Sequence, residues 1–227
     1  MKFFGLQKLT LLDYPEKTAA TVFLSSCDFR CPFCHNAAQL DDDASLIRKS
    51  DVIDFLKKRQ NILDGVCISG GEPLLHDEIG DFIEEIKNLG FDVKLDTNGQ
   101  NPALLKRLAE NNFIDYVAMD IKSSLQNYGK AVGIENFNTC QIEESADFLL
   151  KGAIPYEFRT TVVRELHESN DFHLIGQRWS GATSYFLQSF KDSDGVLSKN
   201  LTAYSVTQMN KFCDILRTYN INANLRE

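Results

Sequence analysis

The sequence predicts an α/β fold with a parallel sheet, and three observations support that prediction. Short apolar runs alternate with amphipathic helical segments along almost all of the 227 residues, the links between them are short, and neither an internal repeat nor a linker interrupts the pattern. Alternation of this kind implies a parallel sheet with helices packed outside it. Right-handed crossovers then produce a partial or full barrel or an open doubly wound sheet. We therefore expect a single domain over residues 1–227.

Six β/α units are predicted, and each contributes one strand and one helix. The strands are expected at residues 18–24, 66–69, 93–96, 116–121, 156–162 and 185–190. The helices are expected at residues 50–59, 77–88, 102–111, 143–151, 171–178 and 207–219. Gly90 and Gly152 suit the carboxyl ends of two of these helices, and Pro102 suits a first helical turn.

Composition and charge exclude several classes of function. Apolar residues make up 43% of the chain and charged residues 25%, as in ordinary globular proteins. The formal net charge of −8 argues against nucleic acid or an anionic membrane as the main partner. Residues 1–14 lack the pattern of a signal peptide, and no apolar run is long enough to span a membrane, so we expect a cytoplasmic protein. In that compartment the six cysteines are expected to be thiols or metal ligands.

One long irregular stretch, residues 25–43, follows the first predicted strand and carries Cys27, Cys31 and Cys34. Thiolates packed this closely can converge on one soft metal centre. A structural zinc site would need a fourth ligand, and His35 is adjacent to Cys34, so the two would have difficulty reaching one ion. The run from Cys31 to His35 also matches the attachment pattern of c-type haem, which leaves Cys27 unexplained. An iron–sulfur cluster with three cysteine ligands and one open iron accounts for all three thiols.

Polar residues and glycines lie at or near the ends of four other predicted strands. They are Gly70, Gly71 and Glu72 after the second strand, Asp96, Thr97 and Asn98 at the end of the third, Asp120 and Lys122 at the end of the fourth, and Arg159 on the fifth. Each group alone has a simpler explanation, such as a turn or an exposed ion pair. Together they occupy strand carboxyl ends, where β/α barrels place their active sites. We therefore interpret them as one functional site.

The cysteine spacing C-x3-C-x2-C, with an aromatic residue before the third cysteine, resembles the pattern of the radical S-adenosylmethionine (SAM) superfamily. Residues 70–72 resemble its Gly-Gly-Glu motif. Further motifs resemble the branch that activates glycyl-radical enzymes: Cys34-His35-Asn36, Asp96-Thr97-Asn98-Gly99, Asp120-Ile121-Lys122 and Arg159. The opening of the chain is similar to the subgroup that activates anaerobic ribonucleoside-triphosphate reductase. This resemblance covers nearly the whole chain and implies a partial (β/α)6 TIM-like barrel of the radical SAM type.

The resemblance implies a set of cofactor contacts. The three cysteines would bind a 4Fe-4S cluster whose open iron binds SAM. The other expected contacts are Phe33, His35 and Asn36 on the adenine side of SAM, Gly70, Gly71 and Glu72 at its amino group, Asn98 nearby, Lys122 and Arg159 at its polar groups, and Asp96, Thr97 and Asp120 around a monovalent cation. Ser25 and Ser26 depart from the Gln-Gly that such activating enzymes commonly carry before the first cysteine.

The resemblance also implies a reaction and its partners. One electron from a flavodoxin or ferredoxin would cleave SAM to methionine and a 5′-deoxyadenosyl radical, which would abstract hydrogen from a glycine of a partner enzyme. That partner is expected to be anaerobic ribonucleoside-triphosphate reductase. Three alternatives stay open: activation of a glycyl-radical enzyme of the pyruvate formate-lyase type, modification of a small molecule or peptide, and a zinc-stabilised binding module without SAM affinity.

Overall fold

The computed structural model describes residues 1–37, 40 and 47–226, so residues 38–39 and 41–43 of the predicted irregular stretch lie outside the described part of the chain. Among the described residues, eight strands form one sheet in the order of the sequence. They are β1 (Phe3–Thr10), β2 (Ala19–Leu24), β3 (Gly65–Gly70), β4 (Asp92–Thr97), β5 (Tyr116–Asp120), β6 (Tyr156–Val162), β7 (Tyr185–Ser189) and β8 (Ala223–Arg226). β1 pairs with β2 antiparallel, and all later neighbours pair in parallel.

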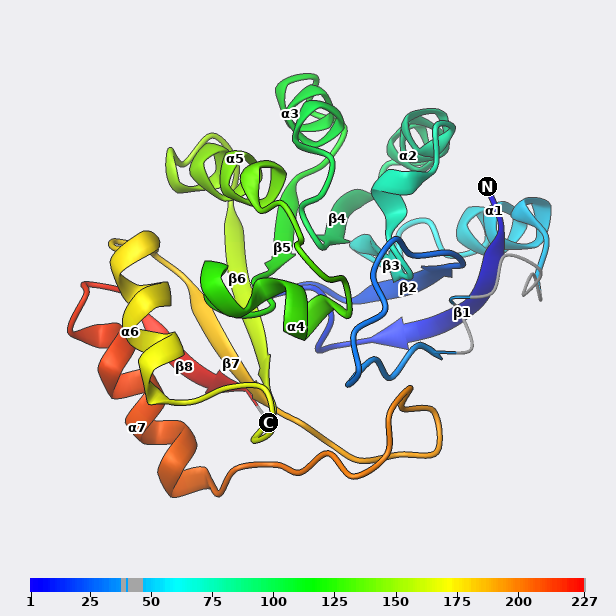
Figure 1. Ribbon diagram of the computed structural model, residues 1–227. Coiled ribbons are helices and arrows are strands. Elements are labelled where there is room, and N and C mark those ends of the chain that lie inside the picture. The colour runs from blue at the N-terminus through cyan, green and yellow to red at the C-terminus, as the bar shows by residue number, and fades with distance from the viewer. Residues whose placement is uncertain (38–39, 41–46, 227) are drawn as a thin grey trace.

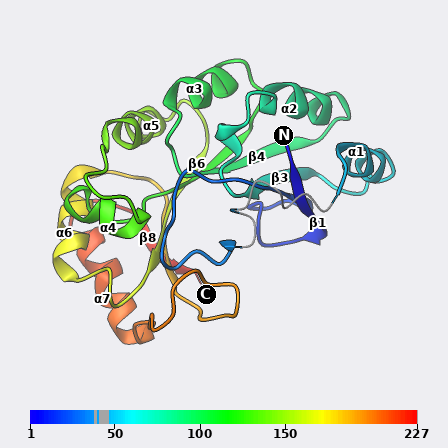
Figure 2. The same cartoon turned by 45° about the vertical axis from the view of Figure 1, so that its right-hand side comes forward.

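Helices cover the outer side of the curved sheet (Figures 1 and 2). They are α1 (Lys49–Lys57), α2 (Ile79–Asn88), α3 (Pro102–Glu110), α4 (Tyr128–Val132), α5 (Cys140–Leu150), α6 (Ser169–Arg178) and α7 (Val206–Arg217), with short 3-10 turns η2 (Pro73–Leu75) and η3 (Leu125–Asn127). Helices therefore separate the parallel strands, which confirms the predicted α/β class. β1 and β8 lie at opposite edges and do not pair with each other in the described residues, so the barrel is open. No helix within these ranges is long and apolar enough to cross a membrane.

Two strands, β1 and β8, were not predicted from the sequence. The register between β1 and β2 shifts at two places, so burial along β1 does not alternate regularly. β8 has four residues and pairs with β7. Both are edge strands, which need fewer apolar residues than strands covered on both sides. The predicted strand at residues 156–162 has the observed bounds of β6, and the other predicted strands and helices differ at their ends by up to three residues.

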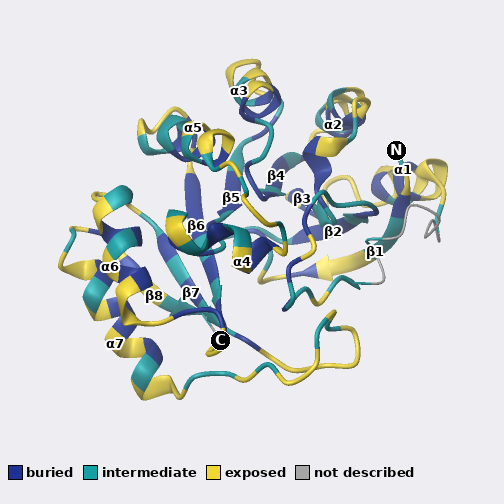
Figure 3. Ribbon diagram, in the orientation of Figure 1, coloured by how far each residue is buried: buried dark blue, intermediate teal, exposed yellow. Residues whose placement is uncertain are grey.

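The core lies between the sheet and its helices, whose sheet-facing residues are buried in Figure 3. α2 shows the pattern: Ile79, Phe82, Ile83 and Ile86 recur at the spacing of one helical face, and each is fully buried. Along β4, Val93 and Leu95 are also fully buried. Because successive side chains of a strand point to opposite faces, the alternate residues of β4 point to the other side of the sheet, into the barrel.

Candidate active site

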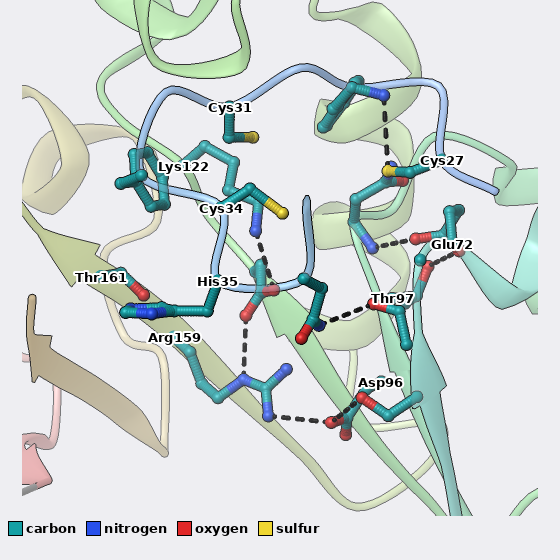
Figure 4. A pocket seen from close by; sticks show the side chains of 18 of the residues that line it. Cys27, Cys31, Cys34, His35, Glu72, Asp96, Thr97, Lys122, Arg159 and Thr161 are labelled. Carbon is teal, nitrogen blue, oxygen red and sulfur yellow. Dashed lines mark hydrogen bonds and ion pairs between the residues drawn. The ribbon is translucent and has the colours of Figure 1, made fainter. Parts of the chain in front are cut away.

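A cavity that is partly open to solvent lies at the carboxyl ends of the parallel strands. All of the residues predicted for the site line it: Cys27, Cys31, Phe33, Cys34, His35, Asn36, Gly70, Gly71, Glu72, Asp96, Thr97, Asn98, Asp120, Lys122 and Arg159. Figure 4 shows them converging from the cysteine loop above and from the strand ends below. Segments far apart in the sequence therefore contribute to one site.

The three cysteines of the loop point their sulfur atoms into the space that the loop surrounds (Figure 4). Burial raises the pKa of Cys31 to about 11, although nearby Lys122 offsets part of this increase. Burial also raises the pKa of Cys27, so both residues are thiols in the metal-free protein. No group of three or more histidine, cysteine or acidic side chains within the described residues converges on a single ion. An iron–sulfur cluster with one open iron is held by three cysteine thiolates, which is the number that this loop presents to the cavity. The donor set therefore fits a cluster.

Backbone contacts hold the cysteine loop against the end of β3. The amide of Gly71 donates to the carbonyl of Leu24 at 2.8 Å, and the amide of Glu72 donates to the carbonyl of Ser26 at 2.8 Å. The side chain of Asn36 closes the other end of the loop, because its amide nitrogen donates to the carbonyl of Gly70 at 3.0 Å. The predicted Gly-Gly-Glu motif is thus in direct contact with the loop that carries the cysteines.

A second support comes from the segment between β7 and α7, residues 190–205, which runs beside the cysteine loop (Figure 1). The amide of Leu197 donates to the carbonyl of Cys34 at 3.3 Å, and the amide of Ser198 donates to the carbonyl of Pro32 at 2.9 Å. The ring of His35 stacks on Phe190, with 5.6 Å between ring centroids. The loop is therefore held between β3 and the C-terminal part of the chain.

Substituting Gly71 by alanine is expected to displace the loop. The added Cβ would lie 1.9 Å from the carbonyl oxygen of Ser26, and a backbone atom cannot rotate away. We expect a loss of about 1–3 kcal/mol in the free energy of unfolding and a clear loss of bound iron after anaerobic reconstitution, measured as iron and sulfide per chain. Gly80→Ala is the control, since the nearest atom to its added Cβ is 4.0 Å away. Full iron loading of Gly71→Ala would contradict this account of the loop.

Glu72 is buried and receives three hydrogen bonds from neutral donors. The hydroxyl of Thr97 donates at 2.7 Å, the amide of Asn98 at 2.6 Å and the amide of Leu74 at 3.0 Å. Burial raises the pKa of Glu72 to about 7, although these hydrogen bonds act to lower it. Because none of the ion pairs in the described chain includes Glu72, its carboxylate would gain from a cationic ligand nearby, such as an ammonium group.

Asp96, Asp120, Lys122 and Arg159 form a chain of ion pairs across the floor of the cavity (Figure 4). The guanidinium of Arg159 donates through Nε to Asp120 at 2.9 Å and through a terminal nitrogen to Asp96 at 3.2 Å. The ammonium of Lys122 donates to Asp120 at 2.9 Å. Burial acts to raise the pKa values of both carboxyls, but the neighbouring cations outweigh it and hold them below their ordinary range. Both acids are therefore ionised at neutral pH.

The prediction missed several residues that line or support the cavity. Phe29, Leu40, Ser69, Thr161 and Gln188 line it without having been predicted for the site. Thr161 and Gln188 are register partners on β6 and β7, at the same carboxyl end as Arg159. Thr161 could have been predicted from the sequence, because it lies two residues after Arg159 and side chains two residues apart on a strand share a face.

The chain forms an open α/β barrel, and a loop with three cysteines covers a charged cavity at its strand ends. This arrangement is typical of enzymes that bind an iron–sulfur cluster beside a small charged molecule. The chain belongs to the radical SAM superfamily, whose family model matches residues 21–170. Members of this superfamily hold a 4Fe-4S cluster and use SAM, so the expectation of an enzyme with these two cofactors is confirmed.

One relative is similar over most of the chain, and solved structures share its fold. A protein of Methanocaldococcus jannaschii named "Putative glycyl-radical enzyme activating enzyme" is 33% identical over 84% of this chain and 80% of its own length. A domain of pyruvate-formate lyase-activating enzyme from Bacteroides vulgatus shares the fold, with a TM-score of 0.57 and 18% identity over 72% of this chain and 99% of that one. SuiB of Streptococcus suis, solved with its precursor peptide SuiA, has a TM-score of 0.72 and 14% identity over 91% of this chain, which spans 48% of SuiB.

Proposed function

We propose that this enzyme is an activase: it cleaves SAM reductively and uses the resulting 5′-deoxyadenosyl radical to generate a glycyl radical on a partner enzyme. The observation that supports this most strongly is the single cavity lined by the cysteines, the Gly-Gly-Glu turn and the ion-pair chain of Asp96, Arg159 and Asp120. The similarity to the M. jannaschii protein supports the activating branch over other members of the superfamily. Residues 1–227 would then form one radical SAM core that acts in the cytoplasm.

In the proposed site, each group of residues has a separate task. Cys27, Cys31 and Cys34 would hold the cluster, which when bound supplies the electron that breaks a carbon–sulfur bond of SAM. The carboxylate of Glu72 and the backbone of Gly70 and Gly71 would complement the amino group of SAM. Phe33, His35 and Asn36 would lie along its adenine side. The positive charges of Lys122 and Arg159 would complement the carboxylate of SAM.

The partner proposed for this activase is anaerobic ribonucleoside-triphosphate reductase, and the proposed electron donor is a flavodoxin or ferredoxin. The opening motif of the chain, Gly5-Leu6-Gln7-Lys8, supports the reductase as partner because it resembles that subgroup. In the structure this motif lies on β1, at the edge of the sheet.

A mixed anaerobic assay tests the proposed partner. The reconstituted enzyme, reduced by a flavodoxin, would be incubated with SAM and with either anaerobic ribonucleoside-triphosphate reductase or pyruvate formate-lyase. Electron paramagnetic resonance would then be used to detect a glycyl radical. We expect the glycyl-radical signal with the reductase. Signal with pyruvate formate-lyase alone would reassign the partner, and 5′-deoxyadenosine without a glycyl radical in either mixture would refute the activase role.

A further inference from the structure

The atoms expected to bind a monovalent cation are already engaged within the protein. One oxygen of Asp96 accepts from Lys94, and the other accepts from Arg159 at 3.2 Å and from Ser69 at 3.0 Å. The two oxygens of Asp120 accept from Arg159 and from Lys122, both at 2.9 Å.

The hydroxyl of Thr97, the other expected ligand of that cation, is engaged as well. It donates to Glu72 at 2.7 Å and accepts from the amide of Gly99 at 3.0 Å. An alkali ion binds through several oxygen atoms at once. At Asp96 and Asp120 it would have to use lone pairs of oxygen atoms that already accept from Lys94, Arg159 and Lys122, so it would lie beside three other positive charges. This donor set does not fit a bound monovalent cation.

The ammonium of Lys94 contacts Asp96, one of the three residues expected around that cation. Lys94 lies on β4 two residues before Asp96, and so on the same face of the strand. Its side chain is 2% exposed and is not among the residues that line the cavity, so it supports Asp96 from beneath the cavity floor. Its ammonium contacts Asp96 and lies 3.8 Å from the sulfur of Cys67. Burial acts to lower the pKa of Lys94, but Asp96 and Cys67 keep it above the ordinary value, so the side chain is a cation.

The net charge of the ion-pair chain is a second argument against a bound monovalent cation. Lys94, Arg159 and Lys122 contribute three positive charges, and Asp96 and Asp120 contribute two negative charges, which leaves one positive charge in excess. One positive charge matches the single carboxylate of SAM. A further cation would lie close to the ammonium of Lys94, where like charges repel strongly because the site is shielded from water.

We propose that the ammonium of Lys94 is a built-in replacement for the monovalent cation, so that this enzyme binds SAM without an alkali metal ion. Lys94 is a positioning residue: it fixes Asp96, and through Asp96 it orients Arg159 toward the cavity. The inference rests on the SAM site of the proposed function but is independent of which partner receives the radical.

The test compares wild type with Lys94→Met in potassium chloride, sodium chloride and tetramethylammonium chloride at equal ionic strength. The dissociation constant of SAM is measured on the cluster-loaded protein, and the melting temperature on the cluster-free protein. Wild type should bind SAM equally well in all three salts. Lys94→Met should bind SAM about tenfold or more weakly in tetramethylammonium and recover in potassium or sodium. Its melting temperature should also rise with the alkali ion, since a ligand bound to the folded state stabilises it.

Lys87→Met is the matched control, because Lys87 is a partly buried lysine on α2 whose ammonium pairs with Asp115 at 2.8 Å, away from the cavity. It should show no dependence on the salt. Weaker SAM binding by wild type in tetramethylammonium would overturn the proposal, and so would a Lys94→Met protein that is indifferent to alkali ions. If Lys94→Met does not fold, the wild-type comparison alone decides. A cluster-loaded wild type that binds no SAM would instead refute the SAM site itself.

Discussion

Replacing Cys31 by alanine is expected to abolish cluster binding and, with it, all cleavage of SAM. Cys31 is the most buried of the three loop cysteines, 7% exposed, and its thiol lines the cavity beside Lys122. Two remaining thiolates do not hold an iron–sulfur cluster that has lost a ligand in an open cavity. The variant should contain little iron and sulfide after anaerobic reconstitution, and 5′-deoxyadenosine should fall by about a thousandfold or more, since the cluster supplies the electron.

The matched control is Cys140→Ala. Cys140 is exposed at the start of α5 and lies outside the cavity, so its loss should leave iron content and SAM cleavage unchanged. Both variants should keep the far-ultraviolet circular dichroism of wild type, because Cys31 lies in a loop, Cys140 is exposed, and alanine is a small apolar replacement for either. Normal 5′-deoxyadenosine from Cys31→Ala would show that the loop cysteines do not bind the reactive cluster.

Arg159→Met should lose both stability and SAM affinity. Arg159 is 13% exposed and pairs with two partly buried carboxylates, which the substitution would leave without their shared partner. Breaking a buried pair from one side typically costs about 3–5 kcal/mol, which chemical denaturation would measure. If Arg159 contacts the SAM carboxylate as proposed, loss of that charged contact should raise the dissociation constant of SAM by about 10- to 100-fold. The cluster should remain, because Arg159 does not belong to the cysteine loop.

Arg178→Met separates these effects from the general cost of removing an arginine. Arg178 also bridges two carboxylates, Glu143 at 2.9 Å and Asp147 at 2.8 Å, but on the outer side of the barrel between α5 and α6. Because that site is more exposed, its loss should cost about 1 kcal/mol or less and should leave SAM affinity unchanged. Arg159→Lys keeps one charge but cannot bridge both acids and should recover part of the affinity. Unchanged affinity in Arg159→Met would remove this residue from the SAM site.

The sequence was informative where periodicity and chemistry coincide. β6 could be delimited because apolar and polar residues alternate over its first four positions. The ends of β3, β4 and β5 were marked by residues that seldom lie in a core, such as Asp96 and Asp120. Parallel strands bring such ends together, so the site followed from the fold class. The same reasoning failed for β1 and β8, whose single neighbours leave only a weak sequence pattern.

Lys94 shows a different limit. A lysine between Val93 and Leu95 looks like the solvent-facing residue of an alternating strand, because lysine is seldom buried. The inner face of this open barrel carries polar side chains, as a solvent-facing surface would. Only the structure shows that the ammonium of Lys94 pairs there with Asp96, which also pairs with Arg159. Sequence patterns report whether a residue suits a face, but not whether that face meets water or other charges.

The contacts of Leu197 and Ser198 with the cysteine loop have a consequence for how the enzyme is made. During synthesis the loop leaves the ribosome long before the segment of residues 190–205, whose amides occupy the carbonyls of Cys34 and Pro32. A nascent chain therefore has all three thiols before residues 190–205 can pack beside them. Iron delivered at that stage would meet water, so we expect the chain to retain iron only once residues 190–205 have folded against the loop. A chain truncated before residue 190 lacks these contacts and should accordingly fail to retain iron, even though all three loop cysteines are present.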